Sequence, residues 1–139
     1  NGNPREVISR DNLHTVYLWG YGDRYPIAEI KNATLAQVEA AVSSIFGMTS
    51  SALAQNSLPD AAKLKALRKH TSLSKAQVTV FTHLPLIGVS SVTDPTGKTL
   101  YYEYDELGRL KRNYYYENNI MQESEKRVLQ EYDYHYRNQ

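Results

Sequence analysis

The sequence predicts an α+β fold, in which a two-helix insertion packs on one face of an antiparallel, meander-like β-sheet of five to seven strands. Two observations lead to this class. Tyrosine, a strand-forming residue, is abundant, with 12 Tyr against 2 Phe and 1 Trp. Residues 34–75 contain one Phe, Phe46, and no Tyr or Trp, and they are rich in Ala, Leu, Ser and Lys, a composition typical of helices.

The length and composition indicate a single domain, because 139 residues and 15.9 kDa are the usual size of one. The absence of cysteine excludes disulfides and thiolate metal sites. With 16 basic and 15 acidic residues, the net charge of +1 does not indicate a polyanionic partner. No segment approaches the roughly 18 apolar residues of a membrane span. Because the start, Asn1-Gly2-Asn3-Pro4, lacks the features of a signal peptide or an initiator Met, we expect a fragment of a larger protein or a processed chain.

The first element is a predicted β-hairpin over residues 14–31. Strand-forming residues run from His14 to Tyr21 and again from Tyr25 to Ile30. Gly22 and Asp23 between the two runs are turn residues, so the runs are expected to pair as antiparallel strands.

The helical insertion over residues 34–75 is predicted to hold two helices. Thr34 and Gln37 fit a capping box at the start of the first, and Gly47 fits its end. A second helix is expected to begin at Pro59-Asp60. Residues 48–57 between them are Ser-rich and predict a turn with a helical fragment. The apolar positions that share one face of the first helix are Leu35, Val38, Val42 and Ile45.

The region after Gln77 is predicted to be a series of β-hairpins over residues 78–137. Asp94-Pro95-Thr96-Gly97 is the most specific turn, since Asp caps a turn, Pro fixes φ at its second position and Gly suits its fourth. Asp105-Glu106-Leu107-Gly108 predicts a second turn, and residues 122–126 predict a loop. The expected strands are residues 78–83, 89–93, 98–104, 109–117 and 128–136.

An internal repeat accompanies these hairpins. Phe81-Thr82-His83 matches Tyr102-Glu103-Tyr104 at an offset of 21 residues. Trp19-Gly20-Tyr21 aligns with the same segment, which places Ile27 on Leu110. Tyr132-Asp133-Tyr134 is a fourth, truncated copy. Each unit has two aromatic positions separated by one residue, then a turn and an apolar residue.

The segment from Ser91 to Leu110 resembles the YD (tyrosine–aspartate) repeat of the RHS family, in which Tyr-x-Tyr-Asp-x-x-Gly-Arg-Leu alternates with a Thr-Asp-Pro-x-Gly turn. The ending Tyr-Asp-Tyr-His-Tyr over residues 132–136 looks like YD-repeat proteins of Bacteroidetes-type bacteria. The residues that match the repeat, to which we assign structural roles, are Asp94, Pro95, Gly97, Tyr102, Tyr104, Asp105, Gly108, Arg109 and Leu110.

The resemblance implies a scaffold. Members of this family are large, exported or surface-exposed proteins whose repeats build long β-sheets, which in some members wrap around a cargo domain. It therefore implies an extracellular or cell-surface location in a bacterium. Contact is expected with the rest of the parent protein or with another protein, through strand edges left open by the sheet.

Catalysis is not indicated by the residues. The four histidines lack metal-ligand spacing, and no nucleophile elbow, P-loop or dinucleotide-binding motif is present. Asp94 and Asp105 begin turns, which accounts for them without a paired-carboxylate mechanism. We therefore expect no enzyme, no metal and no cofactor.

Two surfaces could bind a ligand. Trp19 with Tyr17 and Tyr21, and Tyr132 with Tyr134 and Tyr136, alternate along expected strands, so each triplet would share one face and could stack on sugar rings. The alternative is that these rings form the core.

The second predicted helix is basic, which predicts a solvated face rather than nucleic-acid binding. Its cations are Lys63, Lys65, Arg68, Lys69 and Lys75.

The predicted function is thus a non-catalytic structural or interaction module of a secreted or cell-surface YD-repeat protein. The alternative is a carbohydrate-binding module that uses an exposed Trp/Tyr face.

Overall fold

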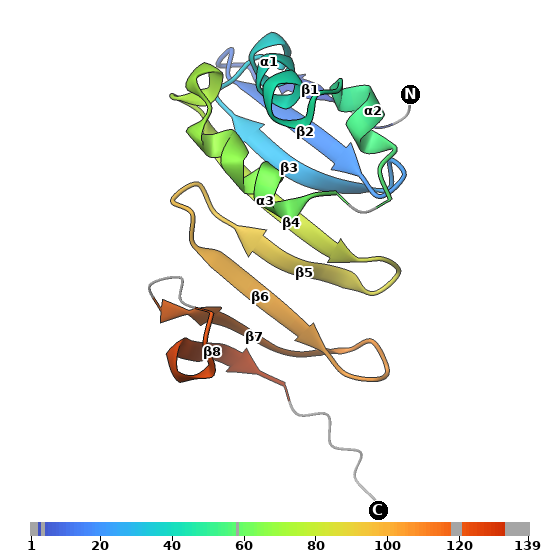
Figure 1. Cartoon of the computed structure of the whole chain (residues 1–139), viewed down its shortest axis with the longest axis vertical. Helices are drawn as coiled ribbons and strands as arrows, with labels where there is room; N and C mark the ends of the chain where they lie inside the picture. The colour runs from blue at the N-terminus through green and yellow to red at the C-terminus, as the bar shows by residue number, and fades with distance from the viewer. Residues whose placement is uncertain (1–2, 4, 58, 118–120, 133–139) are drawn as a thin grey trace, which may run out of the picture.

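The computed structural model describes residues 3, 5–57, 59–117 and 121–132. It shows one eight-stranded antiparallel sheet with helices on one face (Figure 1). The strands follow one another in the sheet in the order of the chain, β1 to β8, which makes the sheet a meander and confirms the predicted α+β class. The strands are β1 (Glu6–Ile8), β2 (His14–Gly20), β3 (Tyr25–Lys31), β4 (Gln77–Leu84), β5 (Gly88–Thr93), β6 (Thr99–Tyr104), β7 (Leu110–Tyr116) and β8 (Lys126–Glu131).

The helical insertion contains the two predicted helices, α1 (Leu35–Phe46) and α3 (Ala61–Ala66), and, between them, the expected helical fragment, which is α2 (Ser50–Ala54). The 3₁₀ helices η1 (Leu67–Lys69) and η2 (Thr71–Leu73) follow α3. The capping box is confirmed, since the Thr34 side chain accepts from the Gln37 amide and the Gln37 side chain accepts from the Thr34 amide. Gly47 ends α1 in the left-handed conformation, as expected.

The strand predictions differ from the structure at the two ends of the sheet. β1 is not among the predicted strands, and it brings the sheet to eight strands. Lys126 belongs to β8 and not to the expected loop, whose residues 123–125 form the 3₁₀ helix η4 (Glu123–Glu125). Of the last predicted strand, residues 133–136 lie outside the described residues.

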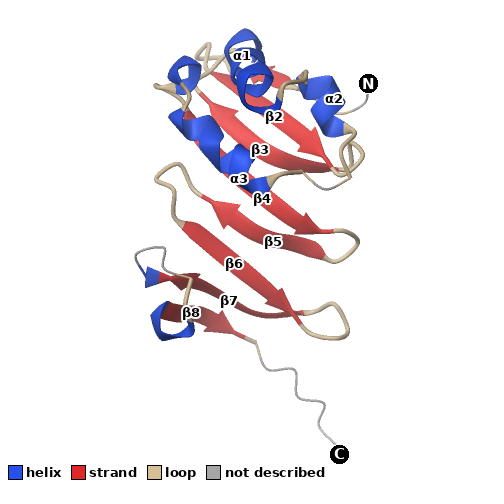
Figure 2. Ribbon diagram, viewed as in Figure 1, coloured by secondary structure: helices blue, strands red, loops and turns tan. Residues whose placement is uncertain are grey.

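The hydrophobic core lies between the helices and strands β2, β3 and β4. Val16, Leu18 and Ile30 on the sheet pack with Val38 and Leu64 of the helices, and all five are at most 1% exposed. Figure 2 shows that α1, α2 and α3 cover this part of the sheet, which we call the covered half (β1–β4), and leave β5–β8, the open half, without them. The core therefore occupies only one half of the sheet.

A shift of pairing register recurs in three hairpins, β2–β3, β4–β5 and β6–β7, and is absent from the β5–β6 hairpin. It lies between Leu18 and Trp19 in β2–β3, between Thr82 and His83 in β4–β5, and between Glu103 and Tyr104 in β6–β7. A further shift lies between Asn113 and Tyr114 in the β7–β8 pair. His83 and Tyr104 are 21 residues apart, which agrees with the predicted offset. Trp19 is equivalent to Tyr104, not to Tyr102 as the sequence alignment predicted, and Pro26 rather than Ile27 is equivalent to Leu110.

Candidate functional site

Tyr17 and Trp19 lie on the face of the sheet that has no helices. Val16 and Leu18 of the same strand are buried beneath the helices, and side chains alternate along a strand, so Tyr17 and Trp19 point to the other side. Burial raises the pKa of Tyr17, and the charge of Glu29 and a hydrogen bond to it act in the same direction. Tyr17 and Trp19, two of the three residues of the predicted aromatic triplet, therefore share the face of the sheet without helices.

Tyr21, the third member of that triplet, lies elsewhere, and the prediction for it was wrong. β2 ends at Gly20, and Tyr21 adopts a left-handed φ of 56° in the turn, which breaks the alternation. Its ring is 8% exposed and meets the rings of Tyr25 and His83 at centroid distances of 5.8 and 5.5 Å. Its hydroxyl accepts a hydrogen bond from the His83 amide at 2.9 Å. Tyr21 is part of the core and is unavailable to a ligand.

The second predicted triplet is only partly described. The Tyr132 amide donates to the carbonyl of Lys111 at 2.8 Å, so the pairing with β7 continues one residue past β8. The Tyr132 side chain is half-buried. Tyr134 and Tyr136 lie outside the described residues.

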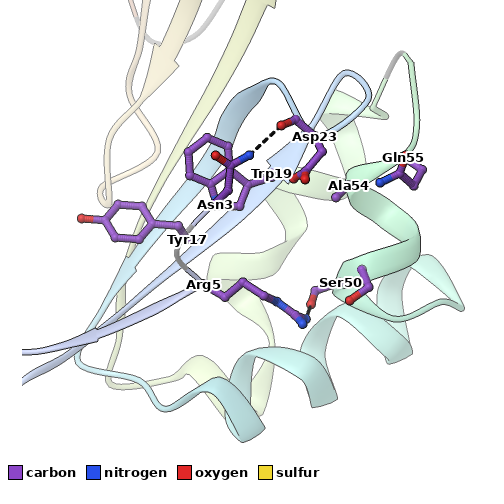
Figure 3. Close-up of a pocket in the computed structure, with 9 residues that line it drawn as sticks. Asn3, Arg5, Tyr17, Trp19, Asp23, Ser50, Ala54 and Gln55 are labelled. Atoms are coloured by element: carbon purple, nitrogen blue, oxygen red, sulfur yellow. Dashed lines mark hydrogen bonds between the residues drawn. The ribbon is translucent and has the colours of Figure 1, made fainter. Parts of the chain in front are cut away.

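A pocket with a cavity of about 220 Å³ lies at the edge of β2 beside Trp19 (Figure 3). Along this edge β1 pairs with residues 14–16, the Tyr17 amide donates to the Arg5 carbonyl at 2.9 Å, and the Asn3 side chain donates to the Asp23 carbonyl at 2.6 Å. The Glu39 carboxylate accepts from the Arg5 guanidinium at 2.6 Å, from the Ser50 hydroxyl at 2.5 Å and from the Ser50 amide at 3.0 Å. In Figure 3 the ring of Tyr17 points away from Ser50. The cation of this pocket is thus already paired within the protein.

The two predicted turns share the same hydrogen-bond pattern. The Gly97 amide donates to the Asp94 carbonyl at 2.9 Å, and the Gly108 amide to that of Asp105 at 3.0 Å. Each Asp amide donates to the backbone carbonyl of the residue after the glycine. The distance is 2.9 Å from Asp94 to Lys98 and 2.8 Å from Asp105 to Arg109. The glycines have φ of 94° and 78°, the left-handed conformation that glycine adopts readily. Pro95 occupies the second position of the first turn.

The aspartates stabilise these turns through their side chains. Asp94 Oδ1 accepts from the Thr96 and Lys98 amides and the Thr96 hydroxyl, at 3.0, 3.0 and 2.6 Å. Burial opposes ionisation of Asp94, but these hydrogen bonds outweigh it and lower its pKa. The pKa of Asp105 is lowered chiefly by the Arg109 amide, with help from the Arg109 guanidinium at 2.9 Å.

Tyr102, Tyr104 and Leu110 lie at paired positions of β6 and β7. Tyr102 is opposite Asn113, and Tyr104 is opposite Leu110. The Tyr104 hydroxyl donates to the Val89 carbonyl at 2.7 Å, and a Cβ at Gly88 would lie 2.5 Å from that hydroxyl. Burial raises the pKa of Tyr104. Tyr104 thus connects β6 to β5.

A second aromatic cluster was missed by the sequence analysis. Tyr101, Tyr114 and Tyr116 contact one another on the helix-bearing face of the open half, with centroid distances of 5.5 to 5.7 Å. The Lys126 ammonium lies 4.2 Å from the centre of the Tyr114 ring. Burial raises the pKa of Tyr101 and of Tyr114. The alternation of Tyr114 and Tyr116 was the available signal, but Tyr101 joins them only through the register of the hairpin.

The basic face of the second predicted helix is not uniformly solvated. Lys63, Lys69 and Lys75 are exposed, as predicted, whereas Lys65 and Arg68 are half-buried against the sheet. Within the described ranges of the chain, no carboxylate lies within 4.0 Å of either cation.

No three His, Asp or Glu side chains in the described part of the chain are grouped as metal ligands. Among the described helices, none is long and apolar enough to cross a membrane.

Comparisons with protein-family models, with curated proteins and with solved structures find no match to this chain. The residues from Ser91 to Leu110 therefore remain the basis of the resemblance to YD repeats.

Proposed function

We propose that this chain is a non-catalytic structural and interaction module of a secreted or cell-surface YD-repeat protein. The observation that carries the proposal is the repetition of one hairpin geometry. The hairpins β2–β3, β4–β5 and β6–β7 shift register at equivalent positions, and two turns use the same Asp and Gly hydrogen bonds. A unit that adds the same hairpin each time extends a sheet, which is the role of a scaffold.

The edge of β8 is the surface on which such a sheet accepts another strand. β8 is the last strand in the sheet order, and most of its side chains are exposed. The Tyr132 amide points to β7, so the amide of the preceding residue, Glu131, points away from the sheet. Unpaired backbone groups at a strand edge pair readily with another chain.

Substitution of Glu131 tests this edge. Glu131→Pro removes the outward amide, whereas Glu131→Ala removes the same ion pair with Arg112 and keeps the amide. Sedimentation velocity over a range of concentrations should show association of wild-type and Glu131→Ala chains and monomers for Glu131→Pro. Equal behaviour of the two variants, or a monomeric wild-type chain, would contradict strand addition.

The location follows from the same proposal and is tested separately. Trypsin added to intact cells of the producing organism should remove a surface protein and spare an internal control. Full protection of the protein under these conditions would contradict a surface location.

Carbohydrate binding is the second candidate function, favoured by the placement of Tyr17 and Trp19 on the face without helices. A thermal-shift screen against bacterial and host glycans tests it, with Trp19→Ala as the control variant. A stabilisation that Trp19→Ala abolishes supports this function, because a ligand that binds only the folded state raises its stability. The absence of any shift argues against it.

A further inference from the structure

Lys65 and Arg68 form an unusual pair of cations where α3 and η1 meet the sheet. Both side chains are half-buried, and neither has an ion pair or hydrogen bond with the described residues. Charged side chains removed from water are normally paired, because their partial desolvation costs free energy. Their position therefore favours an anion from outside the chain.

The space in front of these cations is a groove between α3 and the sheet. Two adjoining cavities of about 220 and 250 Å³ share Lys65 and Gly97 in their walls. The Arg68 guanidinium lies over Gly97, where a Cβ would be 2.5 Å from Nη2. Gly97 therefore allows the turn that follows β5 to approach Arg68 closely and to close one end of the groove.

The other end of the groove is aromatic. Tyr101 and Tyr116 line the cavity that contains Lys65, together with Thr99 and Met121. Tyrosine rings stack on the apolar faces of sugars, and their hydroxyls bond sugar hydroxyls. The Tyr101 phenol is a protonated donor at neutral pH, as an ordinary tyrosine is, and in this structure it donates to the Met121 sulfur at 3.8 Å. Cations and stacking rings thus lie within one groove.

We propose that the groove between α3 and β6 binds an acidic saccharide, with a uronate carboxylate on Lys65 and Arg68 and its sugar ring against Tyr101 and Tyr116. This site differs from the Trp19 pocket, and the inference does not depend on strand addition at β8. A nucleic-acid strand fits less well, because the same sheet face continues from Tyr101 to the carboxylates of Glu103 and Glu131. The basic area is short and suits a ligand with few charges.

Titration with tri-galacturonic acid tests the proposal, with its methyl ester as the uncharged analogue. Calorimetry should show binding of the acid and at least about tenfold weaker binding of the ester, since hydrogen bonds to charged groups are the strong ones. In NMR spectra the amides of Gly97 and Thr99 should shift on addition of the acid. Equal binding of acid and ester, or no binding of the acid at millimolar concentration, would overturn the proposal.

Matched variants locate the site. Lys65→Gln and Arg68→Gln should each weaken binding about tenfold, and Tyr116→Leu should weaken it by removing a stacking surface. Lys63→Gln, on the exposed side of the same helix, should leave the affinity unchanged. Thermal melting of each variant shows that it is folded.

Three results would overturn the assignment even if binding occurs. The first is an equal loss of affinity in Lys63→Gln and Lys65→Gln. The second is a loss in Trp19→Ala with none in Lys65→Gln, which would place the saccharide at the other pocket. The third is tighter binding of an oligo-dT strand than of tri-galacturonic acid, with a steep salt dependence, which would identify the groove as a nucleic-acid site.

Discussion

The two halves of the sheet have the same strand geometry and are stabilised differently. In the covered half, β2, β3 and β4 bury aliphatic side chains beneath helices, so Leu18 and Ile27 are at most 1% exposed. In the open half, every described side chain of β7 is half-buried, and rings and ion pairs connect neighbouring strands. The Arg112 guanidinium, for example, contacts Glu103 on one side at 3.0 Å and Glu131 on the other at 3.1 Å.

The comparison shows that one repeat can serve in two environments. The register shift occurs both under the helices and away from them. The turns differ, because Tyr21, Gly22 and Asp23 all have positive φ after β2, whereas the turn after β6 has the Asp105 and Gly108 hydrogen bonds. The side chains differ, since aliphatic residues exclude water in one half and tyrosines tolerate partial exposure in the other. Stability is therefore expected to depend on burial in the covered half and on turns and cross-strand contacts in the open half.

The largest effect is expected from a core truncation. Leu18→Ala should lower the free energy of unfolding by about 3 kcal/mol, because it leaves a cavity beneath the helices. Leu100→Ala in the open half should cost about 1 kcal/mol, since Leu100 is only half-buried. Urea denaturation measures both. Equal losses would show that the halves do not differ as described.

Substitution of the two turn glycines should destabilise the protein to different extents, because Arg68 lies beside Gly97 and nothing lies beside Gly108. Gly97→Val should destabilise the protein by about 2 kcal/mol, because valine is strained at positive φ and its Cβ would meet Arg68. Gly108→Val has the backbone strain alone, since nothing lies within 4 Å of its Cβ, and should cost less. Thermal unfolding of the pair measures the difference. An unchanged melting temperature in Gly97→Val would contradict the turn.

The cluster of Tyr101, Tyr114 and Tyr116 should contribute less to the free energy of unfolding. Tyr114→Leu should cost about 1 kcal/mol, because the contacts with Tyr101, Tyr116 and Lys126 are lost. Tyr102→Leu is the matched control on the neighbouring strand, since no ring contact of Tyr102 is found among the described residues. Denaturant titration compares them. A larger loss in Tyr102→Leu would show that ring contacts do not stabilise the open half.

The smallest effect on stability is expected from protonation of the turn aspartates at low pH. The pKa values of Asp94 and Asp105 are lowered from 3.8 in the folded protein, so ionisation stabilises the turns above about pH 4 and this stabilisation is lost as the pH falls further. Asp94→Asn should therefore reduce the fall in melting temperature between pH 5 and pH 2.5. Asp11→Asn, at an exposed position, serves as the control. The same pH dependence in wild type and Asp94→Asn would argue against the turn hydrogen bonds.

The features that the sequence predicts well are local. The capping box at Thr34 and the turns at Asp94 and Asp105 depend on residues a few positions apart, and the structure confirms each of them. The offset of 21 residues between His83 and Tyr104 is local in the same sense, since both units have the same spacing from strand to turn. Short-range hydrogen bonds determine these elements whatever packs around them.

The features that were missed depend on tertiary packing. β1 has only three residues, too few for alternation to show, and it is recognised by its pairing with His14 to Val16. Tyr21 was misplaced because its positive φ comes from the turn and not from its residue type. The groove brings Lys65 to Tyr101 only because α3 packs on β4 and its side chains reach over the neighbouring strands, which no spacing in the sequence reveals.

The recurring register shift also sets the shape that a longer sheet would take. Each of these three hairpins has one additional residue in its returning strand, namely Ile27, Ser90 or Lys111. The additional residue makes one strand longer than its partner, so the pair bends there and its right-handed twist increases. In the three hairpins it is the second strand that is lengthened, namely β3, β5 and β7, and these strands run in the same direction, so we expect their bends to add. A sheet extended by such units curves steadily into a wall with a concave side and a convex side.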